Sequence, residues 1–95
     1  NITMSRKAKT AKQLERHFKV ISNHRRIEIL CLIAKVDKIS LDDIAENLDC
    51  NIKTISEQTR KLVKAGLVNK KYQGRLVEHS LSPYGHILHK FIKSF

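Results

Sequence analysis

Three cationic side chains flank Gly74, namely Lys70, Lys71 and Arg75. Residues 67–72 and 76–81 alternate between apolar and polar types, which is the pattern of two paired strands. Gly74 can adopt the positive φ angle that a tight hairpin turn needs. Lysine and arginine side chains along one ribbon are suited to contacting phosphate oxygens. The sequence therefore predicts a basic hairpin with the chemistry of a polyanion-binding surface.

A second group of polar side chains precedes this hairpin, in the segment IKTISEQTRKLVKAG (52–66). Helical spacing places Ile52, Ile55, Thr59, Leu62 and Val63 on one inner face. The outer face carries Lys53, Thr54, Glu57, Gln58, Lys61 and Lys64. Amide, hydroxyl and charged groups on one side of a helix can hydrogen-bond base edges in a DNA major groove.

The charge of the chain is strongly positive and unevenly distributed. Nineteen Lys and Arg residues oppose nine acids, which gives a formal net charge of +10. Five of these acids fall within residues 37–49, whereas nine cations and two acids follow from residue 53 onward. Segregated basic charge favours a polyanionic partner, most often nucleic acid; the alternative is a solubilising surface.

Length and composition predict a single domain. Ninety-five residues can bury a modest core. The longest apolar run, Ile29–Ala34, is too short to span a bilayer, and we find no signal-peptide pattern. Cys31 and Cys50 lack paired spacing and fit a reducing compartment. We therefore expect a cytoplasmic protein with no membrane partner.

The other segments predict a mainly helical domain. Apolar stripes indicate helices over residues 10–21, 24–36 and 41–48, the last with Ser40 as its N-cap. On the second of these, the buried face is expected to hold Ile27, Leu30, Cys31, Ile33 and Ala34. Ser82-Pro83 signals the start of a final helix. The expected fold is mainly α, with about five helices and a small two-stranded β-hairpin.

Two domain limits follow from this pattern. Residues 1–9 are polar and aperiodic, and we expect a flexible basic arm there. Residues 10–95 are then expected to form one domain.

The order of these elements resembles a winged helix-turn-helix regulator of the ArsR type, with the MarR type as a near relative. The resemblance covers about residues 14–92. It rests on SNHRRIEILCLI (22–33), DDIAENLDCNIKTISEQTRKLVKAGLV (42–68), the Gly74-Arg75 turn and LSPYG (81–85). It implies a transcriptional regulator, most often a repressor, that binds double-stranded DNA as a homodimer.

The resemblance also implies roles for individual residues. The helix at about residues 51–65 would enter the major groove, and the hairpin 67–81 would be the wing on the phosphate backbone. Base reading is expected from Lys53, Thr54, Ser56, Glu57 and Gln58. Backbone contacts are expected from Asn51, Arg60, Lys61, Lys70, Lys71 and Arg75, although Arg75 could instead enter a minor groove.

The final helix carries more apolar surface than a core of this size needs. In the resembled family the terminal helices dimerise, which would present two recognition helices to a palindromic site. The expected interface is Leu14, Phe18, Leu88, Phe91, Ile92 and Phe95. The alternative is that both terminal helices only close the core of one chain.

No cofactor is expected. The cysteine pair that many ArsR-type metal sensors carry on the third helix has no counterpart in ISLDDIA (39–45). His86 and His89 are weak metal candidates, because two ligands alone do not make a zinc site. Cys50, just before a helix N-terminus, could be a redox sensor or simply a small turn residue. Cys31 is expected to be a buried core residue.

Two rival functions stay open on the sequence alone. Some winged helices serve as protein-interaction modules in larger complexes, although a basic hairpin and a polar helix face argue against this. Binding of RNA or single strands lacks support, since most of the five aromatic residues fall on predicted core faces. No phosphate-binding glycine loop, metal triad or nucleophile–base pair indicates an enzyme.

Overall fold

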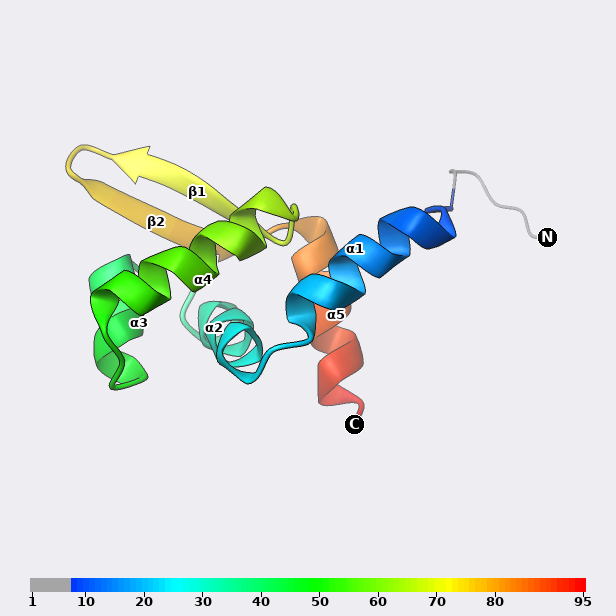
Figure 1. The fold of residues 1–95 in the computed structure, drawn as a ribbon. Helices are drawn as coiled ribbons and strands as arrows, with labels where there is room; N and C mark the ends of the chain where they lie inside the picture. Colours follow the sequence, from blue (N-terminus) through cyan, green and yellow to red (C-terminus); the bar gives the residue numbers. More distant parts are fainter. Residues whose placement is uncertain (1–7) are drawn as a thin grey trace.

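The computed structural model describes residues 8–95 (Figure 1). Most of the predicted basic arm, residues 1–7, lies outside the described part. The elements follow in the order α1 (Ala11–Ile21), α2 (His24–Lys35), α3 (Leu41–Asn47), α4 (Ile52–Lys64), β1 (Val68–Gln73), β2 (Leu76–Leu81) and α5 (Pro83–Lys93). The predicted fold, five helices with a two-stranded antiparallel hairpin, is confirmed.

Polar residues fix where the helices begin. Thr10 and Gln13 form a reciprocal capping box at the start of α1, with each backbone N–H donating to the other side chain. Asn23, Ser40 and Asn51 accept backbone N–H groups in the same way at the next three helices. These caps satisfy donors that the first turn of a helix leaves without a partner, so helix boundaries follow closely from the sequence.

The core is centred on α2, which packs against α1, α3, α4, α5 and β2. Its side chains Ile29, Leu30 and Ile33 are fully buried or nearly so. The predicted buried face of α2 was therefore wrong in part, because it left out Ile29 and included Ile27, Cys31 and Ala34, which are only half-buried. A helix with neighbours on several sides buries a broader and differently centred face than its apolar stripe indicates.

The wing and the terminal helices lie at opposite ends of the molecule. In Figure 1 the β1–β2 hairpin projects at one end, with α3 and α4 beside it, while α1 and α5 lie at the other end. Ser82, between β2 and α5, connects these two ends. The Ser82 backbone N–H donates to the Leu67 carbonyl (3.0 Å), and the Ser82 hydroxyl donates to the Gly66 carbonyl (2.6 Å). The start of the wing and the start of α5 are thereby held together.

Gly85 packs directly against this junction. A Cβ atom at Gly85 would lie 2.1 Å from the Leu67 carbonyl oxygen, a contact that requires backbone movement. We predict that Gly85→Ala lowers the free energy of unfolding by about 3 kcal/mol, as overpacking against a fixed backbone does. Urea denaturation would measure it, with exposed His86→Ala as the control. A loss no larger than that of the control would contradict the close approach.

Candidate nucleic-acid interface

The turn between α3 and α4 has a fixed geometry. Asp49 adopts a positive φ of 50°, a conformation that aspartate tolerates better than most residues. The Cys50 N–H donates to the Ala45 carbonyl (2.9 Å), and the Asn51 side chain accepts from the N–H of Lys53 (2.7 Å). The angle between the two helices is therefore set by backbone and capping contacts, as a helix-turn-helix requires.

One face of α4 is buried and the other is free. Ile55, Thr59 and Leu62 are buried, and the Thr59 hydroxyl has no hydrogen-bond partner in the described structure. Ile52 was expected on this inner face, but it is 44% exposed. Ile52 is the first residue of α4, directly after the turn.

The residues predicted to contact DNA from α4 are mostly exposed. Exposed side chains are Asn51, Lys53, Thr54, Ser56, Glu57, Arg60 and Lys61. They do not all share one stripe: Ser56 lies toward one flank of the exposed face and Gln58 toward the other, since successive helical residues are about 100° apart. The exposed polar surface of α4 is therefore wide, and a DNA groove would contact only part of it.

Gln58 differs from the other predicted base readers. It is half-buried, and its Oε1 accepts a hydrogen bond from Nη1 of Arg26 in α2. The Nε of Arg26 donates to the Val20 carbonyl at the end of α1. The sequence pattern gave no sign of this contact, because 32 residues separate the partners.

The wing pairs in the register Val68↔Leu81 to Gln73↔Leu76, with Gly74 at a φ of 62° in the turn. Lys70, Lys71 and Arg75 are all exposed. Lys71 lies opposite Glu78, so part of the local positive charge is offset. The tip also exposes two large apolar side chains, Tyr72 at 70% and Leu76 at 61%, which the sequence interpretation had not singled out.

Within residues 8–95, no salt bridge holds a cation of α4 or the wing. Within the described structure, the salt bridges join Lys19 to Glu15 (3.4 Å) and Arg25 to Glu28 (2.9 Å), both away from these two elements. Free, exposed cations on neighbouring elements keep a positive surface available to phosphate groups.

The base of the wing is anchored by a buried histidine. His79 is 1% exposed, and it exchanges two backbone hydrogen bonds with Ile39, just before α3. Its ring Nδ1 also lies 2.9 Å from the Ile39 carbonyl oxygen. Burial lowers the pKa of His79 and the charge of Lys70 adds to this, while the hydrogen bond to Ile39 acts in the opposite direction.

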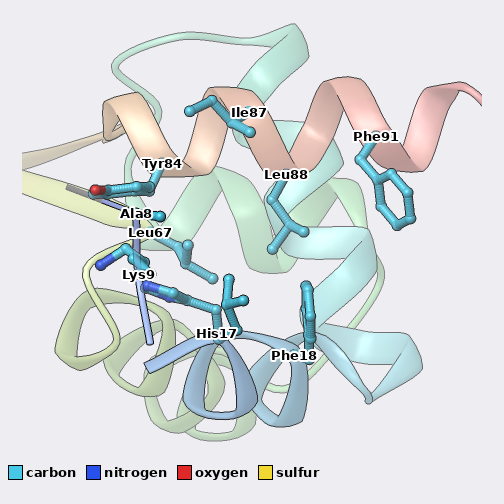
Figure 2. A pocket seen from close by; sticks show the side chains of 10 residues that line it. Ala8, Lys9, His17, Phe18, Leu67, Tyr84, Ile87, Leu88 and Phe91 are labelled. Carbon is cyan, nitrogen blue, oxygen red and sulfur yellow. The ribbon is translucent and has the colours of Figure 1, made fainter. Parts of the chain in front are cut away.

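A groove of about 400 Å³ lies between α1 and α5 (Figure 2). Its walls are mainly apolar, and Figure 2 shows Phe18 directed toward Leu88 across it, with Phe91 further along α5. Ile87 also lines the groove. At one end His17 stacks on Tyr84 (5.6 Å between ring centroids), and the Lys9 ammonium lies 4.1 Å from the Tyr84 ring centroid. Lys9 is therefore docked on the domain, although it was predicted to belong to a flexible arm.

The predicted dimer residues fall into two groups around this groove. Leu14, Phe18, Phe91 and Phe95 are exposed, Phe95 almost completely. Leu88 is 8% exposed and belongs to the core of the chain, against which Ile92 packs half-buried. Only the first group offers free surface to a partner.

The histidine and cysteine candidates are not brought together. His86 is exposed and His89 half-buried, and among residues 8–95 no three His, Cys, Asp or Glu side chains are grouped as a metal site. Cys31 and Cys50 are both free thiols and half-buried, and burial raises the pKa of Cys31. No helix in the described structure is long and apolar enough to cross a membrane.

Comparison with known proteins identifies the family of this chain. The HVO_A0114 family model matches residues 21–87, from the end of α1 into α5. The chain belongs to the HVO_A0114 family. The match includes the helix-turn-helix and the whole wing, so the family is defined over the elements that carry the polar surface.

Two curated proteins match part of the chain. The cadmium resistance transcriptional regulatory protein CadC of Listeria innocua is 32% identical over 60 residues, which are 63% of this chain and 50% of CadC. The chain spans about half the length of the curated relatives it matches.

Solved structures agree in fold. Reduced HlyU from Vibrio cholerae superposes with a TM-score of 0.80 at 21% identity, over 88% of each chain. The homodimeric winged helix-turn-helix DNA-binding domain of Mycobacterium bovis Mb0332, a possible ArsR-family regulator, gives 0.80 at 22% identity, over 94% of this chain and 88% of that one. The predicted resemblance to ArsR-type winged-helix regulators is confirmed.

We predict that the wing anchor makes stability pH-dependent. The pKa of His79 is lowered in the folded state from about 6.5, so the unfolded chain binds the proton more readily. Stability should be fully present above about pH 6.5 and should fall as the pH drops below that value. Denaturant titrations from pH 7.5 to 5.0 would show this slope.

His79→Gln should flatten that slope, and exposed His86→Gln should leave it unchanged. Burial, with the charges of Lys9 and Arg16, also lowers the pKa of His17, so His17 contributes a slope of the same sign that the His79 variant keeps. Equal slopes in the wild type and the His79 variant would contradict the role of His79.

Proposed function

We propose that this chain is a sequence-specific transcriptional regulator that binds double-stranded DNA as a homodimer and acts as a repressor. The observation that carries the proposal is the exposed polar face of α4 beside a wing whose cations have no ion-pair partners in the described structure. Residues 10–95 form the DNA-binding domain, and no catalytic activity or cofactor is expected.

Recognition would divide between two elements. α4 would enter the major groove, where Lys53, Thr54 and Glu57 would reach base edges from the centre of the exposed face, and Ser56 and Gln58 would reach them from its two flanks. Asn51, Arg60 and Lys61 would contact phosphates near the groove. The wing would follow the backbone through its cations, with Tyr72 and Leu76 at the tip able to contact sugars. Phosphate contacts would supply salt-dependent affinity, and base contacts would supply specificity.

The wing contribution is tested by replacing Lys70, Lys71 and Arg75 together with Ala. Three lost phosphate contacts should weaken binding to every duplex and lower the slope of log affinity against log salt by about 3. Fluorescence anisotropy on a mixed-sequence duplex at several salt concentrations measures both, with a matched single strand for comparison. The matched control is a variant in which exposed lysines of α1, α2 and α5, namely Lys12, Lys35 and Lys90, are replaced by Ala. It removes the same amount of positive charge away from the wing.

If the control variant lost as much affinity and salt dependence as the wing variant, net charge rather than the wing would drive binding. If the wild type bound neither duplex nor single strand at low salt, the proposed function would be wrong. The rival function, a protein-interaction module using the same polar face, would then be favoured.

Homodimer formation is supported by exposed apolar side chains that gather at the α1–α5 groove. Phe18, Ile87 and Phe91 are 52%, 55% and 55% exposed, and contiguous apolar surface of this kind marks an interaction site. The same end of the molecule is remote from the wing (Figure 1). Association there would leave both polar faces free, and the Mb0332 domain of the same fold is homodimeric.

We predict that Phe91→Asp converts the dimer to a monomer, because two carboxylates would be buried at a two-fold apolar contact. Light scattering coupled to size exclusion measures the mass. Leu76→Asp, at the exposed tip of the wing, is the matched control and should stay dimeric. A monomeric wild type, or a Phe91→Asp variant that remains dimeric, would exclude the α1–α5 interface.

A further inference from the structure

Arg26 lies where three helices meet. It is half-buried in the first turn of α2, and α1, α2 and α4 are mutual neighbours. Its Nε donates to the Val20 carbonyl in the last turn of α1, and its Nη1 donates to Oε1 of Gln58 on α4. One rigid, planar guanidinium therefore links the end of the first helix to the helix that carries the polar surface.

The chemistry of this contact fixes the orientation of the Gln58 amide. A guanidinium group has only N–H donors, so it can face the amide oxygen of glutamine but not its amino group. The Nε2 amino group of Gln58 must then point away from Arg26, and within residues 8–95 it has no hydrogen-bond partner. A hydrogen bond from a charged donor is stronger than one between neutral groups, which resists a flip of the amide.

We propose that Arg26 is a positioning residue that sets base specificity by holding Gln58 as a hydrogen-bond donor. This inference rests on the proposed DNA-binding function. An amide that presents only its amino group matches a base edge that carries only acceptors in the major groove, which guanine (O6, N7) and thymine (O4) provide. Adenine presents one donor (N6) and one acceptor (N7), which a freely rotating glutamine amide can pair with. Because Arg26 occupies the amide oxygen, Gln58 should prefer guanine or thymine instead of adenine.

The test is a selection from randomised duplexes, followed by competition anisotropy at the position that Gln58 governs, which Gln58→Ala identifies. The wild type should prefer guanine or thymine there. Arg26→Met keeps the length of the side chain and removes its donors. It should reduce discrimination at this one position about tenfold, by freeing the amide to accept from adenine.

A neighbouring arginine provides the control. Arg25 pairs with Glu28 within α2 (2.9 Å), so Arg25→Met removes the same charge without touching α4. It should leave the base preference unchanged. The double variant Arg26→Met/Gln58→Ala should discriminate no worse than Gln58→Ala alone, because both changes act on one contact.

Gln58→Glu keeps Arg26 in place and keeps an oxygen toward it, but replaces the free amino group with a second oxygen. The preference at this position should switch to bases that offer a donor, cytosine (N4) or adenine (N6). If Arg26→Met does not fold, this variant still tests whether Gln58 acts as a donor, because it leaves an oxygen facing Arg26. A base preference that stays the same in Gln58→Glu would overturn the inference.

The outcomes separate the two proposals. A wild type that selects a duplex sequence, together with an Arg26→Met variant that folds and selects the same one, would show that Arg26 only joins helices; DNA binding would stand and the inference would fall. A wild type that selects no sequence would overturn both. Loss of discrimination confined to one position in Arg26→Met and absent in Arg25→Met would support the inference.

Discussion

The packing of α4 on α2 is the constraint on which the rest of the molecule depends. Leu62 and Ile55 of α4 are fully buried together with Ile29, Leu30 and Ile33 of α2. Burial of large aliphatic side chains of this kind contributes about 1.5–3 kcal/mol each, so the exposed face of α4 can be mostly polar without loss of the helix's packing. The polar surface thus follows from the core, since any rotation of α4 that exposed Leu62 would also turn Lys53 and Glu57 away from solvent.

The same logic explains why the wing can be both exposed and well placed. Most residues of β1 beyond Val68 are exposed, and an isolated two-stranded hairpin is only marginally stable. Its position is set at the base, where the paired backbones of His79 and Ile39, the buried ends Val68 and Leu81, and the contacts of Ser82 join it to the core. The charged residues toward the tip of the wing therefore take no part in packing against the core. The stability of the anchored base should depend on pH, because it includes the buried His79.

Local chemistry made much of the fold predictable from the sequence. The cap at Ser40, the Ser82-Pro83 start of α5 and the glycine at the wing turn act within a few residues, so the sequence carries them directly. Ile29, Ile52 and the docking of Lys9 on Tyr84 were missed because they depend on which helices cover which face. The Arg26–Gln58 contact spans 32 residues, and no periodicity encodes a hydrogen bond between two helices. Polar residues on α4 were found by type, but the direction of one amide needed the structure.

That one amide connects the two ends of the proposed mechanism. The α1–α5 groove sets how two copies would sit together, and so how far apart two α4 helices would be. Arg26 donates from Nε to the Val20 carbonyl in the last turn of α1 and from Nη1 to Gln58 of α4. The guanidinium of Arg26 therefore contacts both α1, which would set the spacing between half-sites, and Gln58, which would read a base within a half-site. A shift of α1 within the proposed dimer would therefore reach Gln58 through Arg26, in addition to the direct packing of α1 on α4.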